Sequence, residues 1–239
     1  MDYGVPQIRP RYIMIAIKKE YVADKPNFNP YANIEAAKQK FLTAKGLPID
    51  KPVGARDAIS DLEVDGKELI PCDDVVGYEQ IVYGSPITTY QKLLHGDMNG
   101  TGPNSLRLAK HRDDIRKRFA RILKTCRRGV QLSVKERAKI GIKKKCVVAM
   151  DPEAPSHTLT SLPDDMIHYS EPRILNVREY ARLQSFPDWY AFKGKYTTGG
   201  SLRVKECPRY TQVANAVPPF LADFLGQLLV SIRGELFSE

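Results

Sequence analysis

The sequence lacks the features of a membrane-spanning, exported or disulfide-stabilised protein. No apolar run approaches the roughly 20 residues that a membrane helix needs. The N-terminus, MDYGVPQIRPRY, has no basic segment followed by an apolar core, so we expect no signal peptide. Four scattered cysteines form no Cys-x-x-Cys pair and have no histidine at metal-ligand spacing; they are Cys72, Cys126, Cys146 and Cys207. We therefore expect reduced thiols, no metal site, no membrane association and a cytoplasmic location.

Acidic residues are scarce in one long stretch of the chain. Between Arg107 and Lys145 there are 16 Lys and Arg but only three acids, a local charge of +13, whereas all 239 residues together carry +9. A basic block beside a mildly acidic remainder is typical of a polyanion-binding site. A solvated, charged helix face would give the same pattern. Charge alone therefore favours nucleic acid only slightly.

The spacing of apolar residues predicts several elements. Residues 11–17 (RYIMIAI) form a short apolar run that is typical of a buried strand. Residues 104–125 have the pattern of one amphipathic helix, with Ile115, Phe119 and Ile122 on one face. The remaining predictions are helical segments at 32–44 and 55–62, a flexible loop at 96–103 and a strand at 146–150.

End signals locate further helices. Ser133 and Glu136 are spaced as a capping box before a basic turn, and Asn176 and Glu179 are spaced as an N-cap and N3 pair. The second pair opens a short helix through Gln184. A last helix with a wide apolar stripe is opened by two prolines and can be ended by a glycine, at Pro218, Pro219 and Gly234.

Three blocks of sequence carry a family resemblance. Residues 3–11 (YGVPQIRPR), 176–188 (NVREYARLQSFPD) and 212–219 (QVANAVPP) are similar to motifs VIII, IX and X of the DNA (cytosine-5)-methyltransferases. Residues 155–160 (PSHTLT) resemble the segment that precedes motif IX. One block would be modest evidence, but three in the family's order, with a long insert between the first two, are a specific signal.

The resemblance implies an α/β fold. The chain would hold the C-terminal fragment of a Rossmann-like methyltransferase domain that uses S-adenosylmethionine, plus a small mixed α+β target recognition domain. Residues 1–24 would end the catalytic domain, and residues 25–173 would form the recognition domain. Residues 174–239 would carry motifs IX and X, with a closing helix that returns to the catalytic domain.

The resemblance also implies roles for motif residues. Arg11 would contact O2 of a cytosine flipped out of the duplex, and Arg9 would contact phosphate or base beside it. Gln7 would contact DNA. Asn215 and Ala216 would line the S-adenosylmethionine pocket, although a plain helix N-cap would also explain Asn215. The family's usual glycine before this asparagine is alanine here, which makes a positive φ less comfortable.

The insert and motif IX would serve DNA recognition. A loop at 96–110 would enter the major groove and read base edges. DNA contacts from the insert are expected for Arg107, Lys110 and Arg112, whose basic surroundings would give affinity without sequence information. The motif IX helix would be a scaffold rather than a catalytic element, through Arg178, Glu179, Arg182 and Gln184.

The family's nucleophile motif is missing from this sequence. Phe-x-Gly-x-Gly, Pro-Cys-Gln and Glu-Asn-Val precede motif VIII in the family and supply the cofactor turn, the thiolate and an acid. None occurs here, and Cys72 follows proline but precedes aspartate and lies after motif VIII. We therefore expect activity only with an N-terminal partner that carries Pro-Cys-Gln. A split enzyme, a truncated gene product and an excised segment all fit.

Two other functions stay open at this point. One is a DNA-binding module or remnant without methylation, which the missing nucleophile favours. The other is a fragment of an RNA methyltransferase, which the large basic insert disfavours. The resemblance implies a bacterial protein at the nucleoid, in a restriction–modification system that methylates cytosine C5 within a specific duplex sequence. The apolar last helix predicts that the chain alone needs its partner or self-associates.

Overall fold

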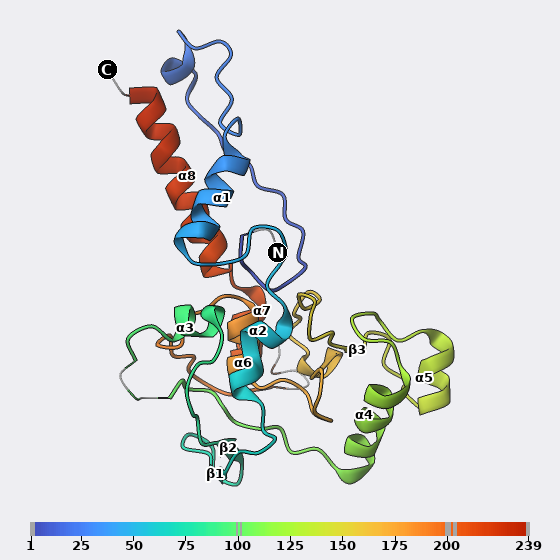
Figure 1. Ribbon diagram of the computed structural model, residues 1–239. Coiled ribbons are helices and arrows are strands. Elements are labelled where there is room, and N and C mark those ends of the chain that lie inside the picture. Colours follow the sequence, from blue (N-terminus) through green and yellow to red (C-terminus); the bar gives the residue numbers. More distant parts are fainter. Residues whose placement is uncertain (1–2, 99, 101, 199–201, 203–204, 238–239) are drawn as a thin grey trace.

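The structure is a computed structural model that describes residues 3–98, 100, 102–198, 202 and 205–237, and it has a mixed α/β composition (Figure 1). Helices dominate, and the strands are short. In chain order the elements are η1 (Lys19–Val22), α1 (Ile34–Ala44), α2 (Ala55–Ile59), η2 (Ser60–Leu62), β1 (Leu69–Pro71), β2 (Glu79–Ile81), α3 (Thr89–His95), α4 (Asp113–Thr125), α5 (Val134–Ile140), β3 (Val148–Ala149), η3 (Pro163–Asp165), β4 (Met166–Ile167), α6 (Val177–Leu183), α7 (Arg209–Asn215) and α8 (Pro219–Phe237).

A helical body lies at the centre of the molecule, with α6 packed against α2 and α7. On one side α8 projects outward with α1 along it, and on another side α4 and α5 form a separate lobe (Figure 1). β1 and β2 make an antiparallel hairpin in which Leu69 pairs with Ile81. β3 and β4 make a parallel pair in which Val148 faces Met166, and this pair joins the lobe to the body.

Both predicted capping boxes are present. Ser133 opens α5 and accepts from the backbone N–H of Glu136, and Asn176 opens α6 and accepts from the backbone N–H of Glu179. In each case the glutamate carboxylate accepts a hydrogen bond from the cap residue's N–H. A third box, Thr88 with Gln91, opens α3. The same spacing in the sequence could have located it.

The predicted strand at 11–17 is wrong for this structure. The segment is extended but forms no ladder with any described residue, and Tyr12 and Met14 are 90% and 74% exposed. The backbone N–H of Ile15 donates instead to the hydroxyl of Tyr31 at 3.2 Å. A strand needs a neighbouring strand to pair its backbone groups, and the described part of the chain offers none at this place.

The predicted helix at 104–125 is correct only in its second half. α4 begins at Asp113, and the residues before it are not helical; Ser105 has a positive φ of 66°. Their backbone is already paired elsewhere: the N–H of Leu108 donates to Glu79 O at 2.8 Å, and Ser105 O accepts from the N–H of Arg178. Tertiary pairing therefore overrides the helical spacing of the side chains. Residues 99 and 101 of the predicted loop lie outside the described residues.

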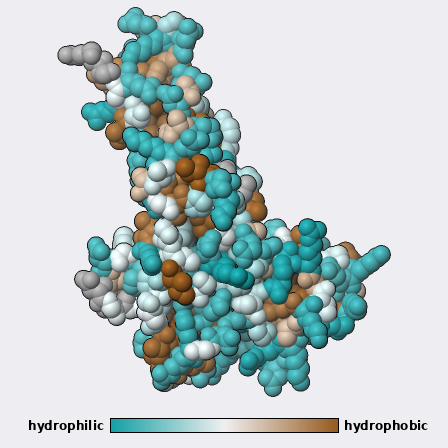
Figure 2. Space-filling model, in the orientation of Figure 1, coloured by the Kyte–Doolittle hydropathy of each residue, from teal (hydrophilic) through white to brown (hydrophobic). Residues whose placement is uncertain are grey.

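α8 begins at Pro219, as the proline pair predicts, but it continues beyond Gly234 to Phe237. By length and composition alone, Arg209–Phe237 is the one described stretch that could cross a membrane. A core helix of a soluble domain meets the same criterion, and four α8 side chains reach the main core: Phe220, Phe224, Leu228 and Ile232. The opposite face leaves Leu229 and Val230 50% and 71% exposed. Figure 2 shows hydrophobic residues exposed among hydrophilic ones on the part of the molecule that α1 and α8 form.

The main core takes residues from all three predicted segments. Val5, Phe41, Tyr180 and Phe224 belong to one cluster, so the N-terminus, the insert and the last helices are folded together. A second, smaller core lies under α4. The predicted boundaries at 24 and 173 therefore do not separate independent cores, and the division into domains stays a prediction.

Candidate functional site

Hydrogen bonds hold the N-terminal segment against residues 156–159. The backbone N–H of Ile8 donates to Ser156 O at 2.8 Å, and the N–H of Ser156 donates to Pro6 O at 2.9 Å. The buried Gln7 side chain accepts from the N–H of Leu159 through its Oε1 at 3.1 Å. These contacts fix the first motif against the segment that precedes the second. The predicted DNA contact by Gln7 is not favoured by this buried position.

Arg9 joins the two ends of the chain. Its Nη1 donates to Ala214 O at 2.9 Å and to Leu159 O at 3.1 Å. Burial, with a smaller repulsion from Arg11, lowers the pKa of the Arg9 guanidinium from its ordinary value. The first and third motifs, 205 residues apart in sequence, are therefore in direct contact.

A cavity of about 640 Å³ lies at this junction. Arg9 and Arg11 line one side of it, and Asn215 and Ala216 line another. Arg11 is exposed, and its Nη1 reaches only the neighbouring carbonyl of Pro10, at 2.7 Å, among the described residues. The apolar walls include Tyr12, Val217, Leu221 and Leu225. The predicted residues of motifs VIII and X thus share one cavity.

Two expectations about motif X need correction. Asn215 is the last residue of α7, so it is not the N-cap of α8, which begins at Pro219. Ala214 is a buried residue inside α7 and is not among the described non-glycine residues with positive φ. Alanine is therefore unstrained at this position, because a helix requires no left-handed backbone there.

The cavity fits part of a cofactor site. Its volume lies in the range of small-molecule pockets, about 300–1,000 Å³. Two guanidiniums and the Asn215 amide offer hydrogen-bond donors, but none of the described lining residues is an acid that could accept from ribose hydroxyls. The described lining therefore lacks one of the groups that such a site would need.

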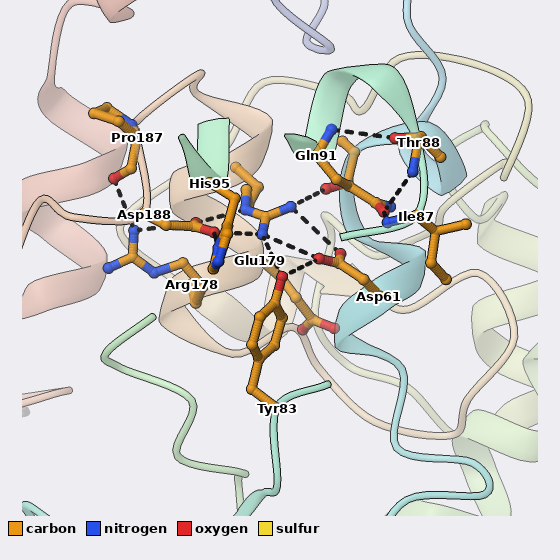
Figure 3. A network of polar contacts seen from close by, with 12 residues as sticks. Asp61, Tyr83, Ile87, Thr88, Gln91, His95, Arg178, Glu179, Pro187 and Asp188 are labelled. Atoms are coloured by element: carbon orange, nitrogen blue, oxygen red, sulfur yellow. Dashed lines mark hydrogen bonds and ion pairs between the residues drawn. The ribbon is translucent and has the colours of Figure 1, made fainter. Parts of the chain in front are cut away.

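The motif IX helix, α6, is buried along its whole length. Arg182 forms a bidentate pair with Asp188, with both N–O distances 2.6 Å, and reaches Asp61 at 3.1 Å. Tyr83 donates to Asp61 at 2.8 Å, and His95 contacts Asp188 at 3.0 Å; Figure 3 shows these four partner residues converging from separate segments. Burial raises the pKa of Asp61 even though Arg182 opposes that rise.

The other polar side chains of α6 and its C-cap also form buried hydrogen bonds. Arg178 donates to the carbonyls of Asn104, Pro187 and Tyr190 at 3.0, 3.2 and 2.8 Å, and burial lowers the pKa of its guanidinium to about 10. Glu179 accepts two 2.7 Å bonds from Arg173. Gln184 donates to Val213 O at 3.0 Å and so ties α6 to α7. The scaffold role of these residues stays a prediction, and their contacts hold α6 within the body.

The three residues of the insert that are predicted to contact DNA differ in burial. Arg107 is buried between the rings of Tyr78 and Tyr196, with its guanidinium carbon 4.3 and 4.1 Å from their centroids. That position stabilises the fold and does not present Arg107 to a partner. Lys110 and Arg112 are exposed, although Arg112 is paired with Asp114 at 3.2 Å.

The sequence pattern does not identify Asp61 as a partner of α6, because it lies 121 residues from Arg182 and only folding brings the two together. Asp188 and Glu171 lie six and two residues from Arg182 and Arg173, but their spacing matches no motif that predicts the pairing. The one available signal is the arginine-rich helix itself, because an arginine that is fully buried needs an acidic partner. Among the described residues no group of three or more His, Cys, Asp and Glu could hold a metal ion, and the four cysteines are free.

Residues 1–231 match the family of C-5 cytosine-specific DNA methylases. The chain belongs to this family. The Type II methyltransferase M.Bpa9945I of Bacillus paralicheniformis is 28% identical over 250 residues, which are 97% of this chain and 49% of that protein.

Two further relatives add detail. The Type II methyltransferase M.AquIB of Picosynechococcus is 45% identical over 76 residues, 31% of this chain and 55% of that protein. A crystal structure from Escherichia coli, described as a prophage-encoded DNA modification methyltransferase, is 22% identical with a TM-score of 0.57, and the match covers 98% of this chain and 58% of that one. This likeness shows the fold alone. The chain spans about half the length of M.Bpa9945I.

Proposed function

We propose that this chain is the DNA-recognition and C-terminal part of a DNA (cytosine-5)-methyltransferase. The observation that carries the proposal is the bridge from Arg9 to the carbonyls of Ala214 and Leu159, which gathers the family's motifs around one cavity. The chain's membership of the family supports the reaction class. The substrate would be duplex DNA, and the methyl group would come from S-adenosylmethionine, the donor that the family uses.

The residues of this chain would bind and orient the substrate. Arg11 is exposed at the cavity and free of ion pairs among the described residues, so its guanidinium can hold the O2 of an extruded cytosine. Arg9 fixes the segment that carries Arg11. Asn215 and Ala216 would form one wall of the cofactor pocket, and the buried network of α6 would keep the recognition residues in place.

The nucleophilic cysteine and the main cofactor motifs would come from sequence outside this chain. The exposed segment 11–17 and the exposed face of α8 are apolar surfaces of the kind that a Rossmann-like catalytic half would cover. M.AquIB supports a separate polypeptide as the source: its 76 matched residues are 55% of it, so that methyltransferase is about 140 residues long, shorter than this chain.

The names of the relatives suggest the biological setting. Several are Type II methyltransferases from bacteria, so we propose a cytoplasmic restriction–modification role for this chain. The partner half would then be encoded close to this chain. Sequencing the adjacent reading frames for Pro-Cys-Gln and for an endonuclease would test the setting without any biochemistry.

A reconstitution assay tests the proposal itself. The chain is mixed with an N-terminal methyltransferase fragment that carries Pro-Cys-Gln, and transfer of labelled methyl groups to duplex DNA and to tRNA is measured. Methylation of duplex DNA only in the mixture supports the proposal. Methylation of tRNA instead would assign the chain to RNA modification. Duplex binding without methylation would favour the alternative, a non-catalytic DNA-binding module. The absence of the nucleophile motif from this sequence supports that alternative.

A variant pair sharpens this test. Arg11→Ala removes the exposed guanidinium from the cavity and should lower methylation strongly while DNA binding by the insert persists. Lys110→Ala, the matched removal of one exposed cation from the insert, should weaken binding slightly and uniformly across sequences. Equal effects of the two substitutions on methylation and binding would contradict the role given to Arg11.

A further inference from the structure

Residues 112–147, called the basic lobe here, form a unit with a small core of their own. Phe119 and Ile122 of α4 pack with Leu132, Val147 and three residues of the β3–β4 region: Ala149, Ile167 and Ile174. Figure 1 shows α4 and α5 together at the side of the body, away from α1 and α8. The lobe is therefore joined to the body through this small core, which it shares with the parallel strand pair.

The outer surface of α4 is a cationic stripe. Its buried residues, Phe119 and Ile122, fix the inward face. Lys117, Arg121 and Lys124 follow one another at four and three residues, lie on the opposite face and are exposed. Lys135 and Lys139 repeat the four-residue spacing on α5 and are also exposed. None of these five makes an ion pair with a described residue.

Two of the three acids in the lobe are already engaged by neighbouring residues, and the third, Asp113, is exposed in the first turn of α4. Asp114 pairs with Arg112 and lies 4.0 Å from Arg118 in the first turn of α4. Glu136 is occupied by the capping box with Ser133, at 2.6 and 2.8 Å. The lobe has 14 Lys and Arg against three acids, so the outward face keeps an almost undiluted positive charge. Such a face attracts a polyanion.

The composition of the surface selects among polyanions. Proteins that hold single strands stack the bases on aromatic side chains, but Phe119 is the only Phe, Tyr or Trp in residues 112–147, and it is buried. An interface with an acidic protein would normally have aromatic or methionine anchors at its centre, and the lobe has none exposed. Phosphates of a rigid duplex need neither feature.

We propose that the basic lobe is a sequence-independent anchor for the phosphate backbone of duplex DNA, held through Lys117, Arg121 and Lys124. The stripe spans about 10 Å along α4 at about 1.5 Å per residue. A duplex carries one charge per about 1.7 Å of its axis, so this length faces about six phosphate charges. The inference takes its partner from the proposed function but assigns the affinity to a surface separate from the motif cavity.

The test is the salt dependence of duplex binding. The full chain and a variant with Lys117→Gln, Arg121→Gln and Lys124→Gln are titrated with a mixed-sequence duplex between about 50 and 200 mM salt. Each lost phosphate contact lowers the slope of log K against log salt by about 0.9, so three contacts change it by about 2.7. Across this fourfold range the parent should therefore lose about 40-fold more affinity than the variant.

Two control variants separate a local site from net charge. Lys19→Gln, Lys40→Gln and Lys51→Gln remove three exposed lysines outside the lobe and should leave the slope unchanged. Exchanging the stripe residues as Lys117→Arg, Arg121→Lys and Lys124→Arg keeps the charge and should also keep the slope. A slope that falls equally in the first control and the stripe variant overturns the proposal. So does equal binding of the parent to polyglutamate or to the separated strands.

The outcomes distinguish this inference from the proposed function. If the parent binds duplex and the stripe variant keeps its slope, the inference fails while the proposed function stands. If the stripe variant loses the slope but no methylation is reconstituted with any N-terminal fragment, the inference stands and the proposed function falls. Failure of the parent to bind duplex overturns both.

Discussion

Replacing Arg182 by methionine removes the cation at the centre of the α6 network. In the parent, its guanidinium serves two carboxylates, Asp188 at 2.6 Å and Asp61 at 3.1 Å, and all three side chains are fully buried. Methionine keeps the apolar stem but leaves both acids without their main partner. Tyr83, which donates to Asp61, would remain, and Asp188 would keep His95 at 3.0 Å and Arg178 at 3.8 Å.

Breaking a buried pair by removing one partner costs about 3–5 kcal/mol. That is a large part of the total stability of a domain, which is about 5–15 kcal/mol. In the variant, the two buried carboxylates are unfavourable when ionised, and protonation removes their charge. Burial already raises the pKa of Asp61, which makes its protonation easier. An acid whose folded pKa is raised favours the folded state at low pH and disfavours it as pH rises. The deficit of the variant should therefore be smaller at low pH than at neutral pH.

Urea unfolding measures this deficit. Trp189, the single tryptophan, follows Asp188 in the chain and reports on this region by fluorescence, and circular dichroism reports on the whole chain. Lys195→Met is the matched control, because it breaks an ion pair of similar length, 2.6 Å to Glu206, at a position where Lys195 is 64% exposed. Exposed pairs contribute about 0–1 kcal/mol. A loss for Arg182→Met no larger than for Lys195→Met would refute the reasoning.

Three further outcomes are expected. Burial and the nearby Arg173 lower the pKa of His168 well below its ordinary value. The neutral imidazole therefore stabilises the fold above about pH 6.5, and this stabilisation is lost as pH falls, by up to about 1.4 kcal/mol per pH unit. The pH dependence of the unfolding free energy should therefore be weaker in His168→Gln. Leu229→Lys on the exposed face of α8 should weaken self-association or partner binding in sedimentation experiments by about 1.5–3 kcal/mol, whereas Gln227→Lys, which adds the same charge beside Asp223, should not. Arg9→Ala removes two hydrogen bonds from a charged donor and should lower the unfolding free energy by about 1.5–3 kcal/mol; an unchanged urea midpoint would contradict its bridging role.

Local chemistry in the sequence determined the starts of several helices. The side chains of Ser133 and Asn176 satisfy free N–H groups within three residues, and Pro219 has no N–H to satisfy at the first position of its helix. Neither effect needs a tertiary contact, so each of these residues marks a helix start correctly. The motif order also pointed to the family, because side-chain identity at fixed spacing survives changes in the insert between them. The excess of cations between Arg107 and Lys145 is equally a property of the sequence alone.

Tertiary structure decided what those local signals left open. Arg107 and Lys110 are both cations of the same basic stretch. Arg107 nevertheless lies buried between two tyrosine rings, whereas Lys110 is exposed. Residues 11–17 have the composition of a strand, but no described residue forms a ladder with their backbone. Residues 104–112 have a helical spacing of apolar side chains, but β2 and α6 pair with their backbone instead. Pairing partners, burial and the meeting of Arg9 with Ala214 depend on residues far apart in the chain. No local pattern encodes such distances, and only the folded arrangement fixes them.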